Sequence, residues 1–466
     1  MKRNIDRRSF LKRLGLGASM TALAIAGCKT TTDDSKDKDL KGSGEMTYRV
    51  NPNTGDKVSL LGYGCMRWPM IPNPDGEGEI VDQDAVNELV DYALDHGINY
   101  FDTAPPYLQG MSEAATGTAL ARHPRDRYFI ATKMSNQHFA RNGMEGKELY
   151  DASVEMYRNS MEKLHTDYID YYLLHSIGGE SGMPFLMQRF FDSGLIDFLK
   201  KEREAGRIRN LGFSYHGDVK VFDYLLSLHD DIHWDFVQIQ LNYVDYRHAS
   251  GKNFNAEYLY DELDKREIPA VIMEPLLGGR LASLSDHWNA KLKEREPERS
   301  IASWAFRFSG SFPRILTVLS GMTYKEHLQD NIESYSPLEP LNEEEFNLLE
   351  EAAVAMVSTP SVPCNTCNYC MPCPYGIDIP SIFSHYNKCI NEGNTPSSVK
   401  DPAYAEARRA FLIGYDRTVP KLRQASHCIG CRQCVPDCPQ SIDIPSELHR
   451  IDQYVENLKQ DNLNKA

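Results

Sequence analysis

The sequence predicts an α/β chain in which a barrel of alternating strands and helices precedes a small cysteine-rich domain. Short β-branched and aromatic runs alternate with amphipathic stretches through the middle of the chain. Eight of the eleven cysteines stand in two runs near the C-terminus, at 364–373 and 428–438. The 466 residues also suffice for two domains, because single hydrophobic cores stop growing at about 250–300 residues.

Composition excludes some classes of protein. The formal net charge is −15, and no basic patch follows the first thirteen residues. Binding to nucleic acid rests on clustered Lys and Arg, so a nucleic-acid partner is not expected. The cysteines are too few for a disulfide scaffold and too clustered for packing alone, which favours a metal centre.

The N-terminal residues predict an export signal. Residues 1–28 begin with a basic stretch, continue through an uncharged run and end in small residues before Cys28. The uncharged run is shorter than the roughly 20 apolar residues that span a bilayer, so it indicates a signal segment. The sequence "RRSFLK" at 7–12 resembles a twin-arginine signal, with Asp6 where Ser or Thr is usual.

The residues "IAGC" at 25–28 resemble a lipobox. On this interpretation Cys28 becomes the acylated N-terminus, and residues 29–45 form a polar tether. We expect a protein that is exported in the folded state and anchored by lipid at the periplasmic or outer surface. The alternative is an ordinary basic tail.

Residues 46–358 predict a (β/α)8 TIM barrel. After a hairpin at 46–64, eight strands are expected at 59–66, 98–104, 128–134, 168–176, 209–215, 236–243, 269–276 and 315–322. Helical patterns such as 84–97, closed by Gly97, and 152–165 lie between them. The alternative is a doubly wound open sheet, but no G-x-G-x-x-G follows the first strand.

Four chemically active side chains follow successive strands. Asp102 and Tyr107 come after the second strand, Lys133 after the third and His175 after the fourth. Each alone has an ordinary structural explanation, but the C-terminal strand ends of such a barrel carry its chemistry. Together they form an acid–base set in which Asp102 holds Lys133 charged. The ammonium is then expected to favour the phenolate and lower the pKa of Tyr107.

The segments "INYFDTAPPYLQGMSEAATGTAL", "FIATK" and "DYIDYYLLH" resemble the aldo/keto reductase family, and the likeness covers about residues 46–340. The resemblance implies that Asp102, Tyr107, Lys133 and His175 are a catalytic tetrad. The tyrosine would protonate a carbonyl oxygen while a nicotinamide, NADP or NAD, delivers hydride to the carbon. The histidine would orient the carbonyl.

The resemblance also implies nucleotide contacts. Ser214 and Gln238 match positions that hold the nicotinamide amide, and Asn331 matches one at the adenine end. Tyr215 follows Ser214 where Asn is expected, and Met273 stands where a stacking Tyr is common.

The sequence "SGMTYKEHLQDNI" at 320–332 offers no Arg for a 2′-phosphate, but Lys325 or His327 could approach one. The choice between NADPH and NADH stays open.

The second cysteine run, C-x2-C-x2-C-x3-C-P, is the pattern of bacterial ferredoxins, in which the fourth cysteine ligates the other cluster. The first run has x2 before its last cysteine, and the tails "GIDIP" and "SIDIP" repeat. A ferredoxin-like iron–sulfur domain is therefore expected at 359–455, before a polar tail at 456–466. On the ferredoxin scheme one 4Fe-4S cluster takes Cys364, Cys367, Cys370 and Cys438, and the other takes Cys428, Cys431, Cys434 and Cys373. Zinc held by C-x2-C pairs is the alternative.

Two functions remain open at this point. The first is an oxidoreductase of the aldo/keto reductase type, acting on a small carbonyl or alcohol and carrying two clusters. The second is an electron-transfer protein whose barrel serves as a docking or substrate-binding scaffold for a redox partner. A nicotinamide moves two electrons as hydride whereas each cluster moves one, so a direct connection between them is unfavourable without a flavin or a relay.

Overall fold

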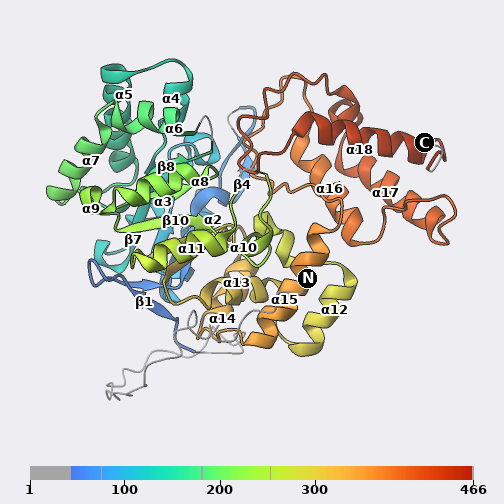
Figure 1. Ribbon diagram of the computed structural model, residues 1–466, viewed down its shortest axis with the longest axis horizontal. Coiled ribbons are helices and arrows are strands. Elements are labelled where there is room, and N and C mark those ends of the chain that lie inside the picture. The colour runs from blue at the N-terminus through green and yellow to red at the C-terminus, as the bar shows by residue number, and fades with distance from the viewer. Residues whose placement is uncertain (1–43, 75, 180–181, 252, 464–466) are drawn as a thin grey trace.

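The structure is a computed structural model that describes residues 44–74, 76–179, 182–251 and 253–463. The predicted signal at 1–28 and almost all of the tether lie outside the described residues. None of the described helices is long and apolar enough to cross a membrane. Figure 1 shows a barrel with the C-terminal helices, coloured orange to red, gathered at one side of it.

Eight parallel strands close into a barrel in the order β10-β11-β12-β3-β6-β7-β8-β9. Pairing of Val318 with Leu61 closes the ring, so the open-sheet alternative is wrong. Each strand lies in or against its predicted run. The strands are β3 (Leu61–Gly64), β6 (Tyr100–Asp102), β7 (Phe129–Met134), β8 (Ile169–Ile177), β9 (Ile208–Tyr215), β10 (Phe236–Gln240), β11 (Ala270–Met273) and β12 (Ile315–Ser320).

The strands are apolar on both faces because the barrel interior and the helical ring both cover them. In β8 only Ser176 is not fully buried, and in β12 every residue is buried. This explains why the strands were visible in the sequence as almost continuous apolar runs.

Two hairpins flank the first barrel strand. The expected one joins β1 (Tyr48–Val50) to β2 (Lys57–Ser59), antiparallel. A second, β4 (Met70–Pro72) with β5 (Glu79–Val81), was not expected. Its sequence is rich in Pro and Gly, which favours edge positions and turns over central strands.

Helices surround the barrel. Asp82 caps the first of them by accepting a hydrogen bond from the Ala85 N–H at 3.1 Å. The same helix is followed by Gly97 at φ +89°, where an added Cβ would lie 2.7 Å from the Tyr48 hydroxyl.

The larger helices of the ring are α2 (Gln83–Asp95), α3 (Ser112–Leu120), α5 (Gly146–Lys163), α7 (Leu195–Glu204), α8 (Val219–Ser227), α11 (Ala256–Lys265), α12 (Asp286–Arg295), α13 (Ile301–Gly310), α14 (Lys325–Ser334) and α15 (Glu343–Val357). The shorter elements are η1 (Cys65–Arg67), η2 (Tyr107–Gly110), η3 (Arg125–Arg127), α4 (Gln137–Arg141), α6 (Gly182–Leu186), η4 (Met187–Phe191), α9 (His229–Ile232), α10 (Asp245–His248) and η5 (Leu277–Ala282).

The C-terminal domain has its own hydrophobic core. The helices α16 (Ile379–Asn391), α17 (Tyr404–Thr418) and α18 (Ile444–Lys459) pack around Phe383, Phe411 and Ile451, and the short turns η6 (Lys421–Arg423) and η7 (Ala425–His427) precede the second cysteine run. Both repeated "IDIP" tails begin a helix, with Pro in its first turn. The internal repeat thus places each cysteine run just before a helix.

The two domains are in direct contact. Arg280 donates a hydrogen bond to the Ser361 hydroxyl at 2.9 Å, and Arg141 pairs with Asp437 at 2.7 Å. These contacts join loops at the C-terminal ends of the barrel strands to segments that flank the cysteine runs.

Candidate active site and cysteine clusters

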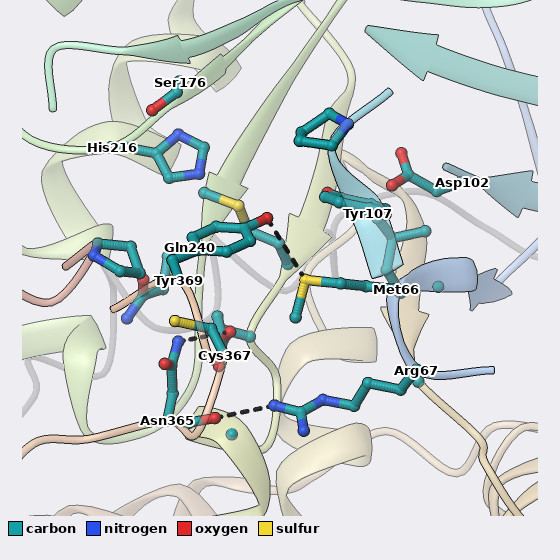
Figure 2. A pocket seen from close by; sticks show the side chains of 18 of the residues that line it. Met66, Arg67, Asp102, Tyr107, Ser176, His216, Gln240, Asn365, Cys367 and Tyr369 are labelled. Atoms are coloured by element: carbon teal, nitrogen blue, oxygen red, sulfur yellow. Dashed lines mark hydrogen bonds between the residues drawn. The ribbon is translucent and has the colours of Figure 1, made fainter. Parts of the chain in front are cut away.

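A cavity of 890 Å³ opens at the C-terminal ends of the barrel strands. Asp102, Tyr107 and His175 line it from the barrel, and Cys367 and Cys438 line it from the C-terminal domain. Figure 2 shows several of these side chains around the cavity. The volume lies within the range of about 300–1,000 Å³ that is usual for ligand sites.

Asp102 and Lys133 form a buried ion pair. Lys133 Nζ donates to Asp102 Oδ1 at 2.5 Å and to the Thr103 carbonyl oxygen at 2.8 Å, and the two side chains are 1% and 3% exposed. Burial raises the pKa of Asp102 above its usual value, although the ammonium opposes this rise. The neighbouring strands β6 and β7 bring the two residues together, and Asp102 lines the cavity.

Tyr107 follows β6 in a tight turn. Leu108 and Gln109 both adopt positive φ, at 50° and 55°, which bends the chain directly after the phenol. Lys133 Nζ lies 4.8 Å from the centre of the Tyr107 ring, and the His175 ring meets it edge-on at 6.0 Å. The structure therefore brings all four predicted residues together.

The expected direction of the Tyr107 pKa shift is wrong. Burial raises the pKa of the phenol well above its usual value, and Asp102, Cys65 and Glu274 raise it further. Lys133 lies over the face of the ring and gives its hydrogen bonds to Asp102 and to the backbone. Tyr107 is consequently protonated at neutral pH, as a proton donor should be.

His175 is held as a neutral imidazole. Burial lowers its pKa well below the usual value, and Lys133 adds to the effect. Ser135 Oγ lies 2.6 Å from His175 Nδ1, and Arg189 donates to the His175 carbonyl oxygen at 2.7 Å. Sequence reasoning did not find Ser135, although it stands two residues after Lys133, directly after the end of β7.

Several predicted nucleotide residues line the cavity. Gln238, Met273, His327 and Asn331 all do so. Gln238 is 2% exposed, and its amide oxygen has no hydrogen-bond partner among the described residues. A buried acceptor without a donor fits the amide group of a nicotinamide.

Two other predicted nucleotide residues have different partners. Ser214 Oγ accepts a hydrogen bond from the Ser176 N–H at 3.0 Å and is fully buried between strands. Lys325 Nζ lies 4.7 Å from the centre of the Tyr92 ring, away from the residues that line the cavity. Of the two candidates for a 2′-phosphate, only His327 borders the cavity.

The eight clustered thiols fall into two spatial groups. Cys438 lies close enough to raise the pKa of Cys364, Cys367 and Cys370, on top of the rise that burial causes. Burial raises the pKa of Cys434 to about 11, with contributions from Cys428, Cys431 and Cys373. Each run therefore has the last cysteine of the other run as a neighbour, which is the arrangement that ferredoxin ligands need.

The other two described cysteines are packing residues. Cys65 is fully buried in the barrel, and Cys389 is 3% exposed on α16. Among the described residues, no group of three or more His, Cys, Asp or Glu side chains is arranged to hold a single metal ion.

A closed parallel barrel with a cavity at the C-terminal ends of its strands defines the chain as a protein of the (β/α)8-barrel class. The chain belongs to the aldo/keto reductase family, whose sequence profile matches residues 61–354, and a 4Fe-4S dicluster domain matches residues 363–444. L-galactose dehydrogenase of Arabidopsis thaliana is 27% identical over 330 residues, which are 66% of this chain and 94% of the plant protein. D-arabinose 1-dehydrogenase of Saccharomyces cerevisiae is 38% identical over 140 residues, 28% of this chain and 36% of the yeast protein.

Solved structures show the same fold. The aldo-keto reductase of Klebsiella pneumoniae in complex with NADPH has a TM-score of 0.50 and 22% identity, covering 69% of this chain and 98% of its own. The holo form of an aldo-keto reductase from Bacillus halodurans also has a TM-score of 0.50 and 22% identity, covering 66% and 96%.

Proposed function

We propose that the protein interconverts a small carbonyl compound and its alcohol by hydride transfer with a nicotinamide held in the barrel cavity. The observation that carries this proposal is that Asp102, Tyr107 and His175 line one cavity, while Lys133 contacts both Asp102 and the Tyr107 ring. The unpaired amide oxygen of Gln238 borders the same space.

Each side chain has a defined task in this proposal. Tyr107 donates a proton to the carbonyl oxygen, because its raised pKa keeps the phenol protonated. Asp102 fixes the Lys133 ammonium beneath the ring. Ser135 occupies Nδ1 of His175, which leaves Nε2 to contact and orient the carbonyl oxygen. The nicotinamide, when bound, supplies or accepts the hydride.

The nucleotide would lie along the lining residues. Gln238 would accept from the nicotinamide amide, Met273 would pack against the ring, and Asn331 would mark the adenine end. Ser214 would act indirectly, because its hydroxyl accepts the hydrogen bond that holds the Ser176 backbone in place. Lys325 is better placed for packing on Tyr92 than for a 2′-phosphate. The NADPH bound in the Klebsiella structure supports the proposal that this cavity binds a nicotinamide cofactor.

We further propose two 4Fe-4S clusters in the C-terminal domain. The near cluster has the ligands Cys364, Cys367, Cys370 and Cys438, and the far cluster has the ligands Cys428, Cys431, Cys434 and Cys373. The match to a dicluster domain and the spatial grouping of the thiols support this assignment. Thiolate ligands of this kind suit iron–sulfur clusters that exchange single electrons with a redox partner protein.

The N-terminal sequence supports one more proposal, that the protein is exported by a twin-arginine-type route and anchored through a lipidated Cys28. Such a route transports folded protein, so cofactors would be acquired before export.

The test of the hydride function begins with binding. Anaerobic holoprotein is titrated with NADPH and NADH, and turnover is followed as loss of the reduced nicotinamide with a panel of carbonyl compounds. The names of two relatives make aldoses the first substrates to try in the oxidising direction. Saturable binding with turnover is expected, and absence of nucleotide binding would leave the electron-transfer alternative as the better account.

A further inference from the structure

The C-terminal domain supplies a wall of the catalytic cavity. Cys367 and Cys438, both proposed ligands of the near cluster, line the same space as Tyr107 and His175. Tyr369 extends into it from the loop that carries Cys367, and its hydroxyl donates to Met66 Sδ at 3.6 Å. Figure 2 shows Tyr369 between His216 and Met66, with its hydroxyl toward the Met66 sulfur and Cys367 next to it.

This wall is fixed to the barrel beside the near-cluster cysteines. Asn365 Nδ2 donates to Glu274 Oε1 at 2.8 Å, and Arg67 Nη2 donates to the Asn365 carbonyl oxygen at 2.8 Å. A Cβ on Gly278 would lie 2.3 Å from Asn365 Cα, so the two loops touch through their backbones. Glu274 itself holds a positive φ of 55° at this contact. The loop that carries the near-cluster cysteines is thus fixed in place as part of the cavity wall.

The far cluster faces the other way. Its ligand Cys431 is exposed, and the neighbouring Ile429 is 63% exposed. Cys370 and Cys434 pack against the same hydrophobic core, so the two groups of thiols lie in the same small domain. The order from inside to outside is therefore cavity, near cluster, far cluster and solvent.

This order matters for the chemistry that the cavity supports. Hydride chemistry moves two electrons together, but a cluster moves one. A ligand that takes electrons from the near cluster across this wall must accept them one at a time. The rings of Tyr107, Tyr369, His175 and His216 border the cavity, and such rings favour contact with a flat conjugated ligand. A quinone combines these properties, because it is a planar carbonyl compound that is reduced in single-electron steps.

We propose that the cavity is also a site of quinone reduction, in which electrons come from the near cluster and a proton from Tyr107. One quinone takes up two electrons and two protons to become a hydroquinone, so that two C=O groups become two C–O–H groups. One electron would come from each of the two clusters, and Cys367 and Cys438 at the cavity wall would hold the nearer one. Tyr107 gives one proton and is reprotonated from solvent, which also supplies the other proton. An outside one-electron donor protein restores the clusters at the exposed end.

The reaction goes beyond the proposed hydride function and shares with it only the role of Tyr107 as proton donor. The test uses anaerobic holoprotein whose clusters have been reduced with dithionite and freed of excess reductant. It is mixed with menadione, a naphthoquinone, in the absence of nucleotide. Cluster oxidation is followed by visible absorbance and by electron paramagnetic resonance, and hydroquinone is measured as product.

We expect a rate that saturates with menadione concentration and one hydroquinone for each pair of clusters oxidised. Tyr107→Phe should slow the saturable phase by about 10²–10⁴, the usual loss when a proton donor is removed, without changing iron content or the resonance spectrum. Tyr375→Phe is the control for the loss of a phenol hydroxyl, because Tyr375, in the C-terminal domain, is 47% exposed and does not line the cavity.

A rate that is linear in menadione and insensitive to Tyr107→Phe would overturn the proposal, because it would mean that the quinone reacts at the exposed far cluster. Clusters that stay reduced would overturn it as well. Since the mixture contains no nucleotide, a failure of the hydride function would not affect the result. Conversely, failure here would leave that function standing.

Discussion

Lys133 lies over the face of the Tyr107 ring, 4.8 Å from its centre, while its hydrogen bonds go to Asp102 and the Thr103 carbonyl oxygen. The lysine is thus fixed by the carboxylate and acts on the phenol through the ring. In a cavity this buried, the phenol stays protonated and can donate.

Tyr107→Phe should abolish most carbonyl reduction. The change keeps the ring and removes only the proton, and a missing acid costs about 10²–10⁴ in rate. Turnover and nucleotide affinity are measured together, with Tyr375→Phe as the control. Affinity should hardly change. A carbonyl substrate reduced by the variant at near the full rate would show that another group is the acid.

Lys133→Met should destabilise the fold as well as the reaction. Removing the cation leaves Asp102 buried without its partner, which costs about 3–5 kcal/mol of the free energy of unfolding. The double variant Asp102→Asn/Lys133→Met should recover part of this loss. Denaturant unfolding of the unaltered protein, the single variants Lys133→Met and Asp102→Asn, and the double variant gives the coupling between the two residues. Equal losses in the single and the double variant would contradict the buried ion pair.

Stability should fall below pH 6.5 partly because of His175. Its pKa is well below the usual value in the folded protein, so below about 6.5 the unfolded chain binds a proton that the folded chain does not. The free energy of unfolding then decreases by up to about 1.4 kcal/mol per pH unit for this group as the pH falls.

Unfolding measured between pH 5 and 8 tests this prediction. His175→Asn should flatten the slope, and His449→Asn, a change at an exposed position of α18, should leave it as it is. His216 should contribute in the same direction, because burial lowers its pKa to about 4. If the slope is unchanged in His175→Asn, a group other than His175 causes the loss of stability at low pH.

The holoprotein should contain about eight irons and eight acid-labile sulfides per chain, as two-cluster ferredoxins do. Cys438→Ser should remove the near cluster, although Cys438 belongs to the second run. Cys389→Ser, which changes a buried thiol of the same domain, is the control. Elemental analysis and electron paramagnetic resonance decide the matter. Zinc without sulfide would disprove the clusters, and loss of the far cluster alone would disprove the crossed ligands.

Replacing Arg7 and Arg8 with Lys should trap the precursor inside the cell, because a twin-arginine route requires the pair. Cell fractionation and mass spectrometry of the N-terminus check this, and the unaltered chain should begin at an acylated Cys28. Finding the unaltered chain at full length in the cytoplasm would contradict both the route and the anchor.

The sequence predicted the barrel and the four residues at its strand ends because these are local signals. Strands buried on both faces are continuous apolar runs, and residues at their C-terminal ends share one rim. The hairpin β4–β5 escaped prediction, since its Pro and Gly residues resemble loops. The contact of Lys325 with Tyr92 was not predicted either, because it joins helices far apart in the sequence.

The cavity wall formed by the C-terminal domain could not be predicted from the sequence, for a similar reason. Asn365 and Glu274 are 91 residues apart, and nothing in their spacing indicates contact. The raised pKa of Tyr107 likewise depends on burial by a second domain and on Asp102 and Glu274. Such effects arise only when segments distant in the chain are packed together.

The shared wall also fixes an order of biosynthesis. Synthesis runs from the N-terminus, so the barrel strands leave the ribosome before Cys367 and Cys438 exist. A chain that ends at α15 lacks the residues that the C-terminal domain contributes to the cavity, among them Cys367, Tyr369 and Cys438. The cavity is therefore complete only when the C-terminal domain has folded. If the cavity is the reaction site proposed above, activity depends on folding of the domain that carries the cysteines.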